Sequence, residues 1–237
     1  MSRVIAVTGT GTEIGKTVVC AAISALALTR GERVAVIKPA QTGVRADEPG
    51  DLAEIARLAG AVTTRELARY PDPLAPDIAA ARSGRPPIRV ADLVASTRKL
   101  ASEHDLVLIE SAGGLLVRYD EDGTTFADLA LACDAEALVV SHAGLGALNW
   151  AALTVEALRH RQSRCLGLVV GQLPAELDLA TECNLDALPK VTGVPLLGVL
   201  PHRMSTMDRR TFVGTARESL HPHLGGLWRK RVRGNSV

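Results

Sequence analysis

The chain has 237 residues, of which 47% are hydrophobic and 22% charged, proportions that favour a folded globular protein over a disordered one. Its 27 lysines and arginines oppose 26 aspartates and glutamates, and the net charge of +1 supplies no overall field for gripping nucleic acid or an anionic membrane. Only two Trp, two Tyr and two Phe are present, which disfavours a base-stacking surface.

Cysteine spacing and hydropathy set further limits. Cys20, Cys133, Cys165 and Cys183 are far apart and form no Cys-x-x-Cys pair, which argues against a structural zinc site. The N-terminal residues lead directly into a strand-like run without the pattern of a signal peptide. No apolar run approaches the ~20 residues that span a bilayer. We therefore expect a cytoplasmic protein that binds neither nucleic acid nor membrane.

Short β-branched runs alternate along the chain with longer segments of helical period. This alternation predicts an α/β fold with a mostly parallel central sheet and helices on both faces. The predicted strands are Val4–Thr8, Arg33–Lys38, Leu106–Glu110, Ala137–Ser141, Leu166–Val170 and Leu196–Leu200. The predicted helices are Gly15–Arg30, Asp51–Ala59, Val90–Glu103, Ala147–Arg161, Ala180–Thr192 and Ser205–Leu220.

Two stretches fall outside this alternation. Tyr70–Arg89 carries five prolines, which fix the backbone and remove hydrogen-bond donors, so we expect an ordered surface excursion. A linker between two domains is the alternative, but strand Leu106–Glu110 resumes the same pattern shortly afterwards. Residues 229–237 are rich in basic side chains and predict a flexible tail. We expect one domain over residues 1–237.

The strongest chemical signal is the segment TGTGTEIGKT, Thr8–Thr17, between the first predicted strand and the first predicted helix. Backbone N–H groups and a helix N-terminus converge on an anion at such a junction. Lys16 would contact the outer phosphates of a nucleoside triphosphate, and the Thr17 hydroxyl would be a Mg²⁺ ligand. The spacing G-x-x-x-x-G-K-[ST] is not met, because Thr10 stands where the first glycine is expected. A glycine-rich turn with a surface lysine is the simpler alternative.

Two further strand ends carry charged side chains. Lys38 ends the second predicted strand and Glu110 the third, and open α/β sheets bind ligands at the carboxyl ends of their strands. Because Mg²⁺ prefers oxygen ligands beside substrate phosphates, Glu110 and Thr17 are candidate metal ligands. Either charged group could instead be an ordinary strand-end residue.

Four segments resemble the dethiobiotin synthetase family, whose members are ATP-dependent ligases. Gly9–Thr17 is similar to the family's loop, including its extra residue, and Lys38–Gly43 resembles its K-P-x-x-[ST]-G. Glu110–Gly114 resembles its E-G-A-G-G, and Gly144–Asn149 a segment at the start of a helix. The resemblance implies a P-loop NTPase-like fold and a homodimer. It also implies Mg²⁺-dependent closure of the ureido ring in biotin synthesis from 7,8-diaminopelargonate, CO₂ and ATP.

The resemblance also implies roles for individual residues. Lys38 and Lys16 would be catalytic, with Lys38 stabilising a carbamate, and Thr12 and Thr42 would lie near the diamine. The metal ligands would be Thr17, Asp51 and Glu110. The nucleotide-binding residues would be Glu13, Ile14, Gly15, Lys16, Thr17, Val18, Asp51, Glu110, Gly113, Gly171, Gln172 and Pro201.

Some of these assignments have direct competitors. Asp51 begins a predicted helix and could be its N-cap, and Asp47 is a rival carboxylate in the same loop. Ser111 replaces the first glycine of the family's E-G-A-G-G and is expected to crowd the backbone there. Gly171-Gln172 follows a predicted strand where many family members carry an Asn that contacts adenine, so other nucleoside triphosphates are candidate co-substrates.

Two other functions are alternatives to the ligase. A partition-type ATPase, acting as a nucleotide-switched interaction protein, carries a signature lysine early in its phosphate loop, where this chain has Gly9–Thr12. Such proteins often add a basic DNA-binding face or a membrane helix, which the near-zero net charge does not favour. An amide-forming ligase of the cobyrinate type usually includes a glutamine-hydrolysing domain, for which the chain has no room.

Overall fold

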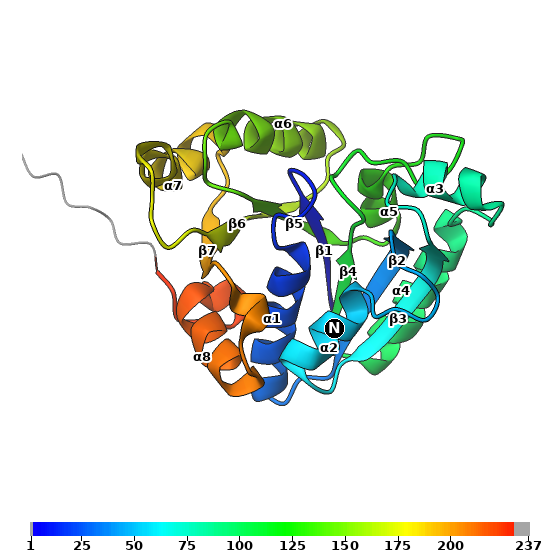
Figure 1. The fold of residues 1–237 in the computed structure, drawn as a ribbon, viewed down its shortest axis with the longest axis horizontal. Helices are drawn as coiled ribbons and strands as arrows, with labels where there is room; N and C mark the ends of the chain where they lie inside the picture. Colours follow the sequence, from blue (N-terminus) through cyan, green and yellow to red (C-terminus); the bar gives the residue numbers. More distant parts are fainter. Residues whose placement is uncertain (1, 230–237) are drawn as a thin grey trace, which may run out of the picture.

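β-branched and aliphatic runs form the centre of the fold. The computed structural model describes residues 2–229, and within them the chain forms one seven-stranded parallel sheet of order β3-β2-β4-β1-β5-β6-β7 (Figure 1). The strands are β1 (Arg3–Gly9), β2 (Val34–Thr42), β3 (Thr63–Tyr70), β4 (Leu106–Glu110), β5 (Glu136–Ser141), β6 (Cys165–Leu173) and β7 (Leu196–Pro201). The expected mostly parallel α/β fold is confirmed.

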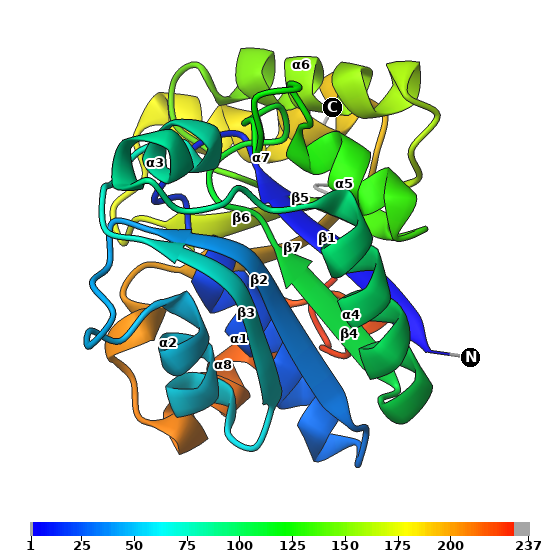
Figure 2. The same ribbon diagram turned by 90° about the vertical axis from the view of Figure 1, so that its right-hand side faces the viewer.

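Helices cover both faces of the sheet. They are α1 (Lys16–Thr29), α2 (Asp51–Ala59), α3 (Pro76–Ser83), α4 (Val90–Glu103), α5 (Phe126–Ala132), α6 (Ala147–His160), α7 (Leu179–Thr192) and α8 (Arg209–Ser219). Helices α1, α2 and α8 lie on one face and α3 to α7 on the other, as Figure 2 shows in side view. Two 3₁₀ turns, Met204–Thr206 and Pro222–Leu224, flank α8. No described helix has the length and apolar character to cross a bilayer.

Alternation along the strands divides the core into two clusters. In β1, Ile5 and Val7 pack with α1 while Ala6 faces the other layer, because successive side chains point to opposite faces. The central strands are buried on both faces, which explains why their sequences are almost continuously apolar. The same alternation decides that Lys38 and Glu110 project on the α1 side, since Ile37 and Ile109 occupy the opposite face.

Three elements were not predicted. Strand β3 is the sheet's edge, and its sequence TTRELARY is mostly polar because only one side of it meets the core. Helix α3 begins at Pro76, inside the stretch predicted as an excursion, since proline is well suited to the first turn of a helix. Helix α5 has only 7 residues, too few for a clear periodic pattern.

One predicted helix is shorter than expected. The segment Ser205–Leu220 contains the 3₁₀ turn and then α8, which begins at Arg209 because the Asp208 side chain caps it by accepting from the Thr211 amide. Of the predicted basic tail, residues 230–237 lie outside the described part of the chain.

Candidate active site

The loop between β1 and α1 is curved by its glycines. Gly15 has a φ of 93° and forms the N-cap of α1, and no side chain caps that helix end. This leaves the first-turn N–H groups of α1 available to an anion. On its other side the loop is anchored by the Thr10 amide, which donates to the Val140 carbonyl of β5 at 2.9 Å.

The end of β6 packs directly against this loop. A Cβ atom added to Gly171 would collide with the carbonyl oxygen of Ile14, so only glycine fits there. The neighbouring Gln172 donates from Nε2 to the Glu13 carbonyl at 3.3 Å. Four of the predicted nucleotide-binding residues are therefore in mutual contact.

Lys16 is buried inside the curve of the loop. Its Nζ donates to the carbonyl of Gly11 at 2.7 Å, so the ammonium lies across the loop's mouth. Burial and the nearby charge of Lys38 lower the pKa of Lys16 below its ordinary value of 10.5. A polyanionic ligand would stabilise the charged form of Lys16, because its negative charge offsets both the burial of the ammonium and the repulsion from Lys38.

Lys38 lies in β2 and is only 3% exposed. Its Nζ lies 2.9 Å from Oε1 of Glu110 and 2.5 Å from Oδ2 of Asp51, and it donates to the Ser111 carbonyl at 3.1 Å. Burial opposes the charged form, but the ion pairs with Glu110 and Asp51 outweigh it and raise the pKa of Lys38 above 10.5. The side chain is therefore a fixed ammonium.

Strand register explains this contact. Ile37 of β2 pairs with Ile109 of β4, so the next residues, Lys38 and Glu110, stand side by side on the α1 face. From the first turn of α1, the Thr17 hydroxyl donates to the same Oε1 of Glu110 at 2.9 Å. Helix α1 and strands β2 and β4 thus meet at the Glu110 carboxylate.

The oxygen groups at this point fit a hard divalent cation. The Oε2 atom of Glu110 is buried and has no hydrogen-bond partner within residues 2–229. Glu110 Oε2, the Asp51 carboxylate and the Thr17 hydroxyl offer only oxygen donors, the type that Mg²⁺ prefers. Within residues 2–229 no cluster of three or more His, Cys, Asp or Glu side chains is placed to hold a metal ion.

The structure distinguishes the two competing aspartates. Asp51 is the first residue of α2 and contacts Lys38, whereas Asp47 is exposed in the preceding loop. The N-cap of α2 is Gly50, not Asp51. The Asp51 amide donates to Oε1 of the buried Gln41 at 2.9 Å, a contact that the sequence reasoning missed.

Ser111 does not crowd the backbone as expected. Its side chain is fully buried and its hydroxyl donates to the Gly113 carbonyl at 2.8 Å, while its amide donates to the Val7 carbonyl of β1. The bend after β4 is closed at Gly113, whose φ is 79°. The replacement of glycine is thus accommodated by a hydrogen bond across the turn.

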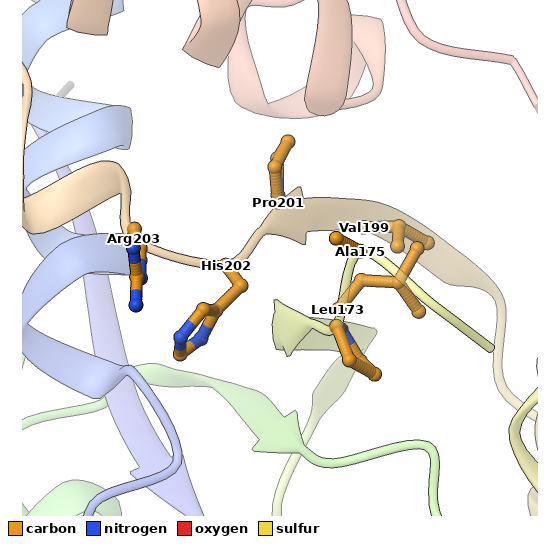
Figure 3. A pocket seen from close by; sticks show the side chains of 7 residues that line it. Leu173, Ala175, Val199, Pro201, His202 and Arg203 are labelled. Atoms are coloured by element: carbon orange, nitrogen blue, oxygen red, sulfur yellow. The ribbon is translucent and has the colours of Figure 1, made fainter. Parts of the chain in front are cut away.

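The remaining predicted residues lie on several different elements. Thr12 is exposed at the top of the loop, and Thr42 is half-buried at the end of β2. Val18 packs partly against the α1 side of the core. Pro201, at the end of β7, lines a cavity of about 430 Å³ together with Leu173, Pro174, Ala175, Val199, His202 and Arg203. Figure 3 shows these side chains at the ends of β6 and β7.

Solved structures share this fold. The MinC:MinD cell division protein complex of Aquifex aeolicus aligns with a TM-score of 0.61 at 14% identity, covering 98% of this chain and 100% of that one. A ParA family ATPase from Chlorobium tepidum aligns with a TM-score of 0.57 at 13% identity, covering 91% and 99%. The fold and the loop together define the chain as a P-loop NTPase-like protein.

Sequence relatives define the family. Residues 3–210 match a family profile described as an AAA domain. The ATP-dependent dethiobiotin synthetase BioD of Saccharopolyspora erythraea is 61% identical over 225 residues, covering 95% of this chain and 98% of that protein. The enzyme of the same name from Streptomyces coelicolor is 53% identical over 225 residues, covering 95% and 94%. The chain belongs to the ATP-dependent dethiobiotin synthetase family.

Proposed function

We propose that this chain is an ATP-dependent cyclo-ligase that converts 7,8-diaminopelargonate and CO₂ into dethiobiotin, a step of biotin biosynthesis, and releases ADP and phosphate. The names and coverage of its relatives support this activity. The observation that carries the proposal is the buried Lys38–Glu110 pair beside the phosphate loop, because it sets a fixed cation next to a triphosphate site. We also propose that the enzyme is cytoplasmic.

The proposed reaction has three steps. One amine of the diamine attacks CO₂, forms a C–N bond and loses a proton, giving a carbamate. A carbamate oxygen attacks the γ-phosphorus and the bond to the ADP oxygen breaks, giving a carbamic-phosphoric anhydride. The second amine attacks the anhydride's carbonyl carbon, loses a proton and expels phosphate, closing the ring.

Positioning and charge stabilisation are what this chain would supply. Negative charge builds up on carbamate and phosphate oxygens, and a preorganised cation in a water-poor site stabilises it effectively. Lys38, a fixed ammonium, would orient the carbamate. Lys16 would neutralise the outer phosphates from within the loop, and the loop amides from Glu13 to Val18 would hold the triphosphate.

Thr17, Asp51 and Glu110 would hold Mg²⁺. The unpartnered Oε2 atom of Glu110 and the all-oxygen donor set support this assignment. When bound, Mg²⁺ would neutralise phosphate charge in the transfer. Because Lys38 contacts both carboxylates, it would share them with the metal and its ammonium would be released toward the substrate side.

The base is proposed to lie beside Gly171, Gln172 and Pro201. The cavity next to Pro201 is lined by hydrocarbon side chains together with His202 and Arg203, and the neighbouring Gln172 amide is bonded to the Glu13 carbonyl. Because Gln172 stands where many family members carry an adenine-contacting Asn and is already bonded to the loop, we infer that nucleoside triphosphates other than ATP also serve. Rates with ATP, GTP and CTP at subsaturating concentration measure this directly.

We further propose a homodimer, with Gly113, Thr12 and Thr42 facing the nucleotide and the diamine. The segment Gly144–Trp150, at the start of α6, is our candidate for the subunit contact. It presents Leu145, 88% exposed, and Trp150, 54% exposed, and burying these two large apolar side chains would favour association.

Phosphate release from ATP tests the proposed function. With purified protein, release should require the diamine, bicarbonate and Mg²⁺ together. Lys38→Ala should reduce turnover far more than nucleotide binding, because Lys38 is assigned to the carbamate and not to the triphosphate. Vigorous hydrolysis without the diamine, or stimulation by DNA or lipid instead, would contradict the ligase and favour a nucleotide-switched ATPase.

A further inference from the structure

Tyr119 is a fully buried tyrosine in the segment between β4 and α5. It is 0% exposed, and its hydroxyl oxygen accepts a hydrogen bond from the Ala112 amide at 2.8 Å. Ala112 lies two residues beyond Glu110, in the bend that leaves the candidate active site. Neither the motif comparison nor the strand pattern assigns Tyr119 any role.

The ring of Tyr119 is held firmly from the side of α5. The backbone amide of Tyr119 donates to the Thr124 carbonyl at 2.8 Å. The centroid of the Tyr119 ring lies 6.2 Å from the centroid of the Phe126 ring. The Phe126 amide in turn donates to the Val117 carbonyl, so the segment is tied to the first turn of α5 at both ends. Burial raises the pKa of Tyr119 from its ordinary value of 10 to about 12, so the phenol is neutral well beyond physiological pH.

The Ala112 amide and the Ser111 carbonyl belong to one peptide unit. A peptide unit is planar, and in the trans form its N–H and C=O point in opposite directions. Ala112 N–H donates to Tyr119 on one side, while the Ser111 oxygen accepts from Lys38 Nζ at 3.1 Å on the other. Turning this plane would therefore move the acceptor away from the lysine.

We propose that Tyr119 is a positioning residue for Lys38, acting through the Ser111–Ala112 peptide. This inference rests on the proposed function of Lys38 at the carbamate. Tyr119 itself touches no reacting atom. Its hydroxyl fixes the peptide plane, the plane fixes the Ser111 carbonyl, and that carbonyl, with Glu110 and Asp51, fixes the direction of the ammonium.

Tyr119→Phe is the direct test, and the chain provides a matched control. Tyr70 is also buried, at 1% exposure, and its hydroxyl donates to the Pro86 carbonyl at 2.8 Å. Tyr70→Phe therefore removes one buried phenol hydrogen bond without touching the bend after β4. Both variants should unfold at similarly lowered temperatures, which separates stability from positioning.

Only Tyr119→Phe should affect turnover. A displacement of the reacting cation by a fraction of an ångström should lower kcat by about ten- to a hundredfold, with KM for ATP within about twofold of the wild type. In the same variant, amide hydrogen exchange over residues 110–116 should accelerate. Equal kcat values for the two variants, or unchanged exchange in that peptide, would overturn the inference.

A readout on Lys38 itself separates this inference from the proposed function. Trace acetylation followed by mass spectrometry, with the exposed Lys99 as internal reference, reports how tightly Nζ is held. Tyr119→Phe should increase labelling of Lys38 and Tyr70→Phe should not; no increase overturns the positioning role. If the wild type released no diamine-dependent phosphate, the proposed function would fail, and the labelling result would still decide whether Tyr119 holds Lys38.

Discussion

Replacing Lys38 by methionine should destabilise the protein far more than removing an ordinary ion pair. The ammonium contacts Glu110, which is 1% exposed, and Asp51, whose side chain is 34% exposed. Asp51 can turn to water when the ammonium is lost. Glu110 cannot, and the Thr17 hydroxyl and the Cys20 thiol, both uncharged, are the hydrogen-bond partners left to it among the described residues.

The expected cost follows from stranding a buried carboxylate. Breaking a buried pair by removing one partner typically costs about 3–5 kcal/mol. In a chain of this size each kcal/mol lowers the unfolding temperature by about 2–4 °C, which gives a fall of roughly 6–20 °C. Adding Glu110→Gln to Lys38→Met should recover most of that loss, since the buried carboxylate is then replaced by an uncharged amide.

Thermal unfolding across a pH series is the assay. The pKa of Lys38 is raised above its unfolded value, so its contribution is fully present below about pH 10.5 and is lost only as the pH rises through the higher folded value. From about pH 6 to 9 the wild-type contribution is therefore constant.

Arg33→Met is the matched control, because Arg33 forms an exposed pair with Asp105. It should cost a small fraction of the Lys38 effect. Equal losses in Arg33→Met and Lys38→Met, or no recovery in the double variant, would refute the reasoning.

Three other predictions concern the nucleotide and the metal. Gly171→Ala should abolish ADP binding in calorimetry, because the new Cβ would displace the Ile14 carbonyl and with it the phosphate loop to which Ile14 belongs. Unaltered affinity would show that the loop tolerates the shift. ADP affinity should fall as the pH rises toward 10.5, since the lowered pKa of Lys16 makes the free protein lose that charge before an ordinary lysine would, and a flat profile would contradict this. Mn²⁺ binding, followed by electron paramagnetic resonance, should be tighter in Lys38→Met and weaker in Glu110→Gln than in the wild type. Equal affinities in all three proteins would show that these carboxylates do not bind the metal.

Much of the central sheet could be predicted because its strands are buried on both faces. Runs such as Leu106–Glu110 are almost purely apolar and end at a charged residue, so their limits are visible in the sequence. The edge strand β3 has no such pattern, because most of its side chains are polar, unlike those of the other edge strand, β7. Helix α5 is short, but its Thr125–Asp128 capping box was a usable signal.

The site residues divide in the same way. Lys16, Thr17, Lys38 and Glu110 lie at strand ends or in a loop of recognisable composition, and parallel strands bring such ends together. The choice of Asp51 over Asp47 depended on where α2 begins, which spacing alone does not fix. The side chains of Gln41 and Tyr119 accept hydrogen bonds from backbone amides of other segments. The sequence around each residue contains no pattern from which such a contact can be predicted.

The carbon of bicarbonate gives the most direct test of the proposed reaction. Protein incubated with ¹³C-bicarbonate, 7,8-diaminopelargonate, ATP and Mg²⁺ should yield a cyclic urea that carries the label in its new carbonyl, with one ADP formed per labelled molecule. ADP formed without any labelled ring product would contradict the account, whatever the rate of hydrolysis.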